Sequence, residues 1–153
     1  MTTSWRIVKP AFAEDAFSGR GARLYGGRWN ARGVSMVYTS STLSLATLEL
    51  LVNTPRPQRL PEYVAFPCRF PARLVKELNP ALLPAQWRVY PAPPELQQIG
   101  SEWVTNLESA ILAVPSAVVE SELNYLFNPN HPDFDAIEIG AARPFAFDLR
   151  LTR

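Results

Sequence analysis

The sequence predicts an α+β fold with a mostly antiparallel sheet. Its 153 residues suffice for one domain with a sizeable core, and we treat residues 1–153 as a single domain. Hydrophobic residues make up 47% of the chain and charged residues 19%, which is typical of globular proteins. Fifteen prolines divide the chain into short elements. Strand-like segments outnumber helical ones, and a parallel sheet would need more crossover helices.

The first third of the chain is expected to hold two strands separated by a loop. Residues 5–8 form a first short strand. Residues 20–30 are glycine-rich and are expected as a loop or an irregular hairpin arm. Residues 35–39 alternate loosely in polarity, which predicts a second strand that carries Tyr38 near its end.

A helix is expected to follow this strand directly. Its apolar residues recur at helical spacing over residues 42–53. Ser40 or Ser41 supplies the cap at the start of the helix, and Pro55 and Pro57 prevent it from continuing.

The middle of the chain is expected to contain one more long strand and a second helix. Residues 63–70 are rich in aromatic residues, and Pro67 predicts an edge position for that strand. Residues 79–94 form an excursion interrupted by prolines. Residues 94–107 suit a helix with Pro94 in its first turn, although Gly100 disfavours it by about 1 kcal/mol relative to alanine.

The last third is expected to be mainly strands. The expected strands comprise residues 110–114, 117–119, 136–139 and 145–149, with a turn at residues 128–132.

Residues 19–33 concentrate the features of an anion site. They contain five of the seven glycines and four of the thirteen arginines: Arg20, Arg23, Arg28 and Arg32. No acidic residue occurs between Ala16 and Leu48. Arginine presents a planar fork of donors that matches phosphate oxygens, and glycine lets the backbone approach closely. The stretch therefore suits a phosphate or pyrophosphate.

Known phosphate-binding motifs are absent from this stretch. No Gly-Lys-Ser/Thr follows the glycines, and their spacing does not fit the dinucleotide fingerprint. An exposed arginine in a tight turn remains the alternative for Arg28, and Trp29 is favoured as a packing anchor over a ligand contact. The net charge of +1 argues against a general nucleic-acid binder.

Two further residues have both a structural and a functional interpretation. Glu49 is the only charged residue between Arg32 and Arg56. It suits either a solvent-facing stripe of its helix or a carboxylate that lines a cleft. Tyr38 suits either a half-buried packing residue or a platform on which an aromatic ring stacks.

Nucleophilic and metal chemistry have little support. Ser116 follows Pro115 at a break between strand-like pieces, without a Gly-x-Ser-x-Gly motif. A turn serine or a hydroxyl that hydrogen-bonds a ligand fits it better. His131 lies in a turn-like segment, and one histidine without a cysteine partner makes a zinc site improbable.

The location predicted from the sequence is the cytoplasm. Cys68 is the only cysteine, so no intrachain disulfide can form, which suits a reducing compartment. The N-terminus lacks the apolar core of a signal peptide, and no apolar run approaches a membrane helix in length.

Taken together, these segments resemble the RES domain family, toxins of bacterial toxin–antitoxin pairs. The most specific pieces are Gly-Gly-Arg-Trp-Asn at 26–30 and Val-Pro-Ser-Ala at 114–117, with a helix-borne glutamate between them. The matching stretches, nearly end to end, are residues 21–30, 37–40, 45–49, 114–119, 122–129 and 147–151.

The resemblance implies a fold and a set of site residues. The fold implied is that of ADP-ribosyltransferase toxins, with a split sheet and a cleft for NAD⁺. The family's catalytic arginine, glutamate and serine fall on Arg28, Glu49 and Ser116. The implied substrate-binding residues comprise Tyr38, Arg23, Trp29 and Asn124; for Asn124 a turn-capping role is the alternative.

The resemblance also implies an activity and a partner. The activity is destruction of NAD⁺ by phosphorolysis or hydrolysis of the nicotinamide–ribose bond, with NAD⁺ as substrate, inorganic phosphate as a candidate co-substrate and no cofactor or metal. The partner is a cognate antitoxin of the Xre, helix-turn-helix type, without direct contact to nucleic acid or membrane. The alternatives are a transferase that adds ADP-ribose to a protein and an RNA-binding or RNA-cleaving toxin.

Overall fold

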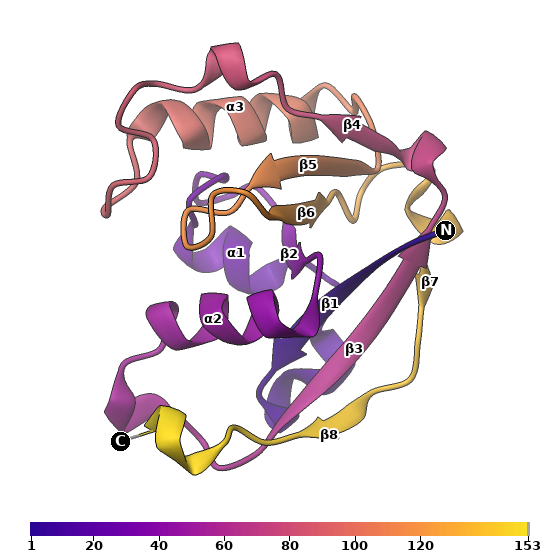
Figure 1. The fold of residues 1–153 in the computed structure, drawn as a ribbon. Coiled ribbons are helices and arrows are strands. Elements are labelled where there is room, and N and C mark those ends of the chain that lie inside the picture. The colour runs from indigo at the N-terminus through magenta and orange to yellow at the C-terminus, as the bar shows by residue number, and fades with distance from the viewer. Residues whose placement is uncertain (153) are drawn as a thin grey trace.

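An eight-stranded sheet forms the centre of the computed structural model, which describes residues 1–152 (Figure 1). The strand order is β4-β5-β6-β2-β1-β3-β7, and β8 also pairs with β3. Every pairing is antiparallel except that of β4 with β5. The strands are β1 (Thr2–Val8), β2 (Val37–Ser40), β3 (Tyr63–Phe70), β4 (Val75–Glu77), β5 (Ile111–Pro115), β6 (Leu123–Phe127), β7 (Glu138–Ile139) and β8 (Arg143–Phe145).

Three α-helices accompany the sheet: α1 (Arg20–Tyr25), α2 (Leu43–Asn53) and α3 (Pro94–Thr105). Helix α2 lies against β1 and β2, whereas α3 lies at the opposite end of the sheet beside β4 and β5 (Figure 1). The predicted α+β class with a mostly antiparallel sheet and few helices is therefore confirmed. No helix among residues 1–152 is both long and apolar enough to cross a membrane.

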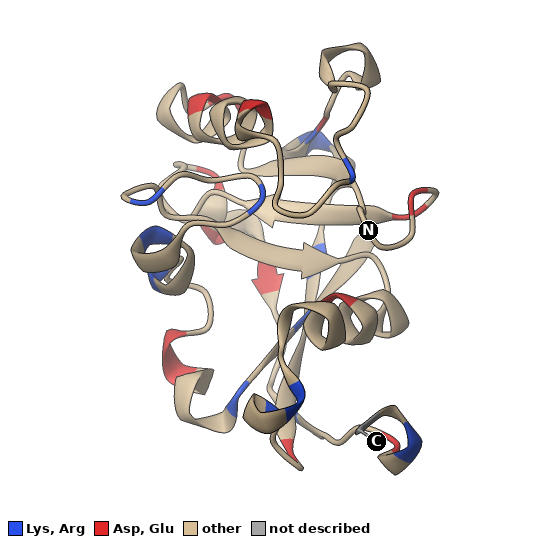
Figure 2. Cartoon of the chain, turned by 90° about the vertical axis from the view of Figure 1, so that its left-hand side faces the viewer, with Lys and Arg blue, Asp and Glu red and all other residues tan. Residues whose placement is uncertain are grey.

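The sheet is held by apolar packing on both faces. One core cluster joins Trp29 and Met36 to Trp103 of α3 and Leu112 of β5. A second cluster, whose residues alternate with those of the first along β5 and β6, includes Phe70 and Phe127, whose rings meet edge-on at 5.8 Å. Figure 2 shows basic and acidic residues interspersed over helices, strands and loops.

The segment predicted as a loop at residues 20–30 instead begins with helix α1. Gly19 and Gly26 flank this helix at φ +75° and +73°, a left-handed region that favours glycine. The helix thus begins after Gly19 and ends before Gly26. Residues 26–36 form the loop that leads into β2.

Helix α2 confirms the expected helix but not its expected cap. Thr42, rather than Ser40 or Ser41, accepts the backbone N–H of Leu45 at 3.0 Å. Ser40 still belongs to β2, and Ser41 donates its backbone N–H to the carbonyl of Leu123. The turn between strand and helix is thereby shortened to two residues.

The edge position predicted for β3 is wrong, because β3 pairs with β1 on one side and with β7 and β8 on the other. The carbonyl of Pro67 accepts the N–H of Gly140 at 2.8 Å. In a strand the N–H and C=O of one residue point the same way. The N–H that proline lacks therefore faces the irregular chain between β7 and β8, where the ladder is already interrupted.

Helix α3 is confirmed, and its glycine has a packing reason. A Cβ atom at Gly100 would lie 1.8 Å from the carbonyl oxygen of Trp29. The helix therefore packs directly against the backbone of the loop that follows α1.

The predictions for the last third are partly correct. The turn at residues 128–132 and the strand at 110–114 are present, the latter as β5. Residues 117–119 are not a strand, because the side chain of Ser116 binds the N–H groups of Val118 and Val119. Strands β7 and β8 are shorter than expected or displaced, and residues 146–148 belong to no strand. Strands β4 and β6 were not predicted.

Candidate active site

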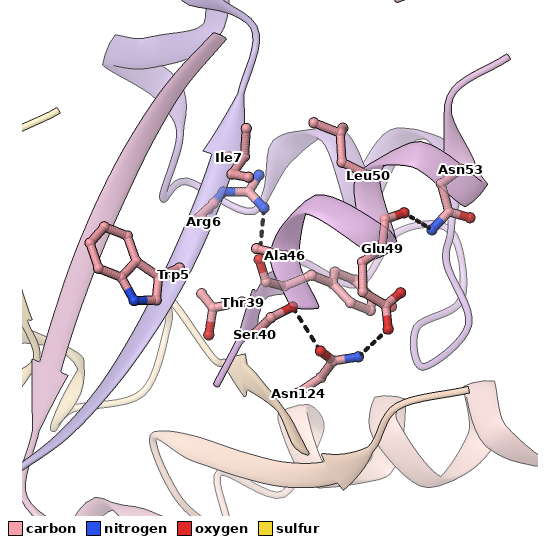
Figure 3. A pocket seen from close by; sticks show the side chains of 11 residues that line it. Trp5, Arg6, Ile7, Thr39, Ser40, Ala46, Glu49, Leu50, Asn53 and Asn124 are labelled. Atoms are coloured by element: carbon pink, nitrogen blue, oxygen red, sulfur yellow. Dashed lines mark hydrogen bonds between the residues drawn. The ribbon is translucent and has the colours of Figure 1, made fainter. Parts of the chain in front are cut away.

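A cavity of about 220 Å³ lies where β1 and β2 part, beneath helix α2 (Figure 3). The ladder between these strands has a single residue pair, Trp5 opposite Ser40, whereas β1 and β3 pair over seven residues. The sheet is therefore split at this point. The lining residues come from β1, β2, α2 and β6, and they include Tyr38, Glu49 and Asn124.

Glu49 projects from α2 into this cavity with one oxygen fixed. Its Oε1 accepts hydrogen bonds from Ser116 Oγ at 2.7 Å and from Asn124 Nδ2 at 2.8 Å. No donor among residues 1–152 binds Oε2. A carboxylate held in this way keeps one oxygen for a ligand hydroxyl or a developing positive charge.

The hydroxyl of Ser116 is fully used within the protein. It donates to Glu49 and accepts the N–H groups of Val118 and Val119, both at 3.0 Å. A serine hydroxyl has one donor and two acceptor positions, and all three are occupied. The side chain is also completely buried. Ser116 thus orients Glu49, which differs from the expected direct contact with a ligand.

Asn124, on β6, links Glu49 to the sheet. Its Oδ1 accepts from Ser40 Oγ at 2.8 Å while its Nδ2 donates to Glu49 (Figure 3). Four parts of the chain, namely β2, β6, α2 and the loop after β5, meet in this network. One amide N–H of Asn124 remains for a ligand, so the residue does more than the turn capping considered as an alternative.

Arg28 lies in the loop after α1, and its guanidinium is turned to a distant segment. Nη1 donates to the carbonyl of Trp87 at 2.8 Å and Nη2 to that of Val89 at 3.2 Å. Burial lowers the pKa of Arg28, and the charge of Glu49 partly opposes this shift. The predicted arginine and glutamate are thus close enough to interact, although Arg28 does not line the cavity itself.

Tyr38 is held by the loop that contains Arg28. Its hydroxyl donates to Asn30 Oδ1 at 2.6 Å and accepts the N–H of Trp29 at 3.0 Å. A Cβ atom at Gly27 would lie 2.6 Å from this hydroxyl, so glycine is needed there. Burial raises the pKa of Tyr38, which keeps the phenol protonated. The tyrosine is therefore both a packing residue and part of the cavity wall.

Two of the expected substrate-binding residues lie away from the cavity. The ring of Trp29 is 2% exposed and packs with Trp87 and Trp103 in the core, which confirms the packing role that its residue type favoured over a ligand contact. Arg23 is exposed on α1, with no side-chain hydrogen bond or ion pair within the described chain. His131 binds the N–H of Asp133 within its turn. Among residues 1–152, no cluster of three or more metal-ligating side chains occurs.

Arg6 is a cavity residue that the sequence analysis missed. It is the one basic side chain in the cavity lining of the described chain. Its guanidinium donates to the carbonyls of Ala16 at 2.6 Å and Tyr38 at 3.0 Å, and so bridges β1 and β2 where their ladder stops. Burial lowers its pKa to about 10. The available signal was a single charge within the otherwise uncharged segment 2–8.

A family model of the RES domain matches residues 3–148. The chain belongs to the RES domain family. This RES domain is 38% identical over 149 residues to "Toxin Res" of Yersinia enterocolitica, covering 96% of this chain and 97% of that protein. It is also 38% identical over 161 residues to "Prs ADP-ribosylating toxin" of a Sphingobium species, covering 100% and 99% of the two chains.

A solved structure shares the fold of this RES domain. The toxin–antitoxin complex MbcT–MbcA of M. tuberculosis contains a chain that matches with a TM-score of 0.71 and 18% identity. The match covers 95% of this chain and 84% of that chain. At this identity the likeness establishes the fold.

Proposed function

We propose that this RES domain protein is the toxin of a toxin–antitoxin pair and that it cleaves the nicotinamide–ribose bond of NAD⁺. The observation that carries the proposal is the carboxylate of Glu49, fixed through one oxygen by Ser116 and Asn124 and free at the other, beside a cavity in a split sheet. The names of the relatives, "Toxin Res" and "Prs ADP-ribosylating toxin", support an NAD⁺-consuming toxin.

Cleavage of the nicotinamide–ribose bond requires the protein mainly to position the substrate and to stabilise the charge that develops. When the C1′–N bond breaks, its electron pair moves onto the pyridinium nitrogen, and nicotinamide leaves as a neutral molecule. No general acid is required, which suits a chain with one histidine. Positive charge develops on the ribose, as in glycoside cleavage, and Glu49 stabilises it. An oxygen of water or phosphate then bonds to C1′, and water releases its proton to solvent.

The cavity size favours the nicotinamide riboside end of NAD⁺ as its occupant. Small-molecule pockets usually measure about 300–1,000 Å³, and this cavity is smaller, at about 220 Å³. The ring of Tyr38 offers an aromatic face to the cationic nicotinamide. Arg6 is placed to attract the adjacent phosphate, and the remainder of the dinucleotide extends beyond the cavity.

Arg28 serves in this proposal as the second phosphate contact. It lies near Glu49, but two of its donors now bind carbonyls of residues 83–93, a segment that we call the strap. Phosphate is a stronger acceptor for guanidinium than a neutral carbonyl. Binding of NAD⁺ therefore exchanges these carbonyls for phosphate oxygens and releases the strap.

A second candidate function is transfer of ADP-ribose to a protein, favoured by the name of the Sphingobium relative. A third, binding or cleavage of RNA, has less support, because charges of both signs are interspersed over the fold and His131 lies outside the cavity. We also infer an antitoxin partner, since the structural neighbour was solved in a toxin–antitoxin complex. The Xre type of that antitoxin is implied by the sequence resemblance.

Product analysis of purified protein incubated with NAD⁺ separates these functions. Free nicotinamide without a protein acceptor, with ADP-ribose in buffer or a phosphorylated ADP-ribose when phosphate is present, supports NAD⁺ cleavage. Label from NAD⁺ that appears only on an added protein supports the transferase. Intact NAD⁺ together with degraded RNA contradicts both. Co-expression with a cognate antitoxin is expected to abolish nicotinamide release and restore growth.

A further inference from the structure

A second hollow, of about 610 Å³, adjoins the active-site cavity on the same face of the sheet. Trp5 lines both spaces and separates them. Helix α2 covers this face only beside β1 and β2. Over β3, β7 and β8 the face is left open, and the hollow lies there.

The pairing register gathers its side chains on one face. Thr3 pairs with Arg69 and Trp5 with Pro67, so these four side chains point to the same face of the sheet. Gly140 brings the chain close over Pro67, where a Cβ atom would lie 2.7 Å from the proline ring. The hollow is thus shaped by a close backbone approach as well as by side chains.

Two arginines in the hollow have free hydrogen-bonding groups. The guanidinium of Arg143 lies over the ring of Trp5, 5.4 Å from its centre. Neither Arg143 nor Arg69 makes an ion pair or a side-chain hydrogen bond within residues 1–152, and both are exposed. Glu138 pairs with Arg69 in the ladder, but no ion pair within 4.0 Å joins them. The hollow therefore carries a net positive charge, and its two guanidinium groups have N–H donors that bind no other side chain or carbonyl of residues 1–152.

We propose that this hollow binds a phosphate group of a ligand used by the active site beyond Trp5. Arginine forks match phosphate oxygens, and Arg143 is oriented by its stacking on Trp5. The binding of phosphate itself follows from the hollow alone. Which molecule carries this phosphate rests on the proposed function: it is either the pyrophosphate of NAD⁺, held here in place of the contact with Arg28, or a separate phosphate that accepts the ADP-ribose.

Titration of the purified protein tests the proposal directly. Orthophosphate and ADP-ribose are each titrated calorimetrically at low salt into the wild-type protein, the double variant Arg69→Gln/Arg143→Gln and the control Arg73→Gln. Arg73 is an exposed arginine outside both spaces. We expect the double variant to bind one of these ligands at least about tenfold more weakly, because each charge-assisted contact is lost, and the control to match the wild type. Circular dichroism checks that all three are folded.

The affected ligand identifies the source of the phosphate. Weaker binding of orthophosphate alone assigns the hollow to a separate phosphate, and weaker binding of ADP-ribose alone assigns it to the dinucleotide. Unchanged binding of both, or no binding of either by the wild type, overturns the proposal. NAD⁺ turnover by the wild type is measured in parallel, so a failure of the proposed function is seen independently of the binding result.

Discussion

Glu49 and Ser116, which are 67 positions apart, are joined by a hydrogen bond of 2.7 Å in which the serine hydroxyl is the donor. The serine is saturated by this bond and by two backbone N–H groups. Its contribution to the reaction is therefore expected to pass through the carboxylate, as a positioning residue.

The first prediction concerns Ser116→Ala. Loss of the hydroxyl leaves Glu49 oriented by Asn124 alone, so we expect kcat for nicotinamide release to fall about 10- to 100-fold, with KM for NAD⁺ changed less than about threefold. The free energy of unfolding is expected to fall by about 1–2 kcal/mol, since buried N–H groups lose their acceptor. Ser121→Ala, an exposed serine in the same loop, is the control. A change in KM with kcat intact would indicate a direct ligand contact instead.

The site residues that the sequence predicted correctly are those whose positions depend on a local sequence pattern. The helix of Glu49, the strand of Tyr38 and the serine after Pro115 follow from residue order alone. The role of Arg6 does not, because it depends on which strands become neighbours. Arg6 binds the carbonyl of Tyr38 where the β1–β2 ladder stops after one pair, and no periodicity within a single segment reveals this.

The second prediction concerns the strap and Arg28. Arg28→Ala removes the hydrogen bonds to the carbonyls of Trp87 and Val89, which flank Arg88. We expect trypsin to cleave after Arg88 several-fold faster in this variant, because local opening of the strap becomes easier. Arg32 is an exposed arginine of the same loop, and we expect trypsin to cleave Arg32→Ala at the same rate as the wild type. Equal cleavage of both variants would show that Arg28 does not hold the strap.

The third prediction separates the ring of Tyr38 from its hydroxyl. Tyr38→Phe loses the bonds to Asn30 and Trp29, so the free energy of unfolding is expected to fall by about 1–2 kcal/mol. The affinity for NAD⁺ is expected to stay within about threefold, because the aromatic face is kept. Chemical denaturation measures the change in stability. The affinity for NAD⁺ is measured in proteins that also carry Glu49→Gln, so that the ligand is not consumed. Tyr25→Phe, at an exposed tyrosine, is the control, and a loss of affinity with unchanged stability would contradict this division.

The fourth prediction is a fall in stability at alkaline pH. Burial raises the pKa of the Cys68 thiol from its ordinary value of 9.0 to about 12, partly opposed by Arg6 and Ser4. Above pH 9 the unfolded chain therefore releases this proton while the folded chain retains it, and unfolding becomes easier. Between pH 8 and 10 we expect the wild type to lose about 1 kcal/mol more of its free energy of unfolding than Cys68→Ala. Parallel profiles for the two proteins would exclude the thiol as the cause.

The role of Glu49 is tested most directly by nicotinamide release from NAD⁺ by the wild type and by Glu49→Gln. Glutamine keeps an oxygen that accepts from Ser116 and Asn124 but carries no charge, so the fold is expected to remain, with a shift in Tm below about 3 °C. Release is predicted to fall about 100- to 1,000-fold, because the carboxylate no longer stabilises the ribose cation. Turnover by Glu49→Gln equal to that of the wild type would contradict the account.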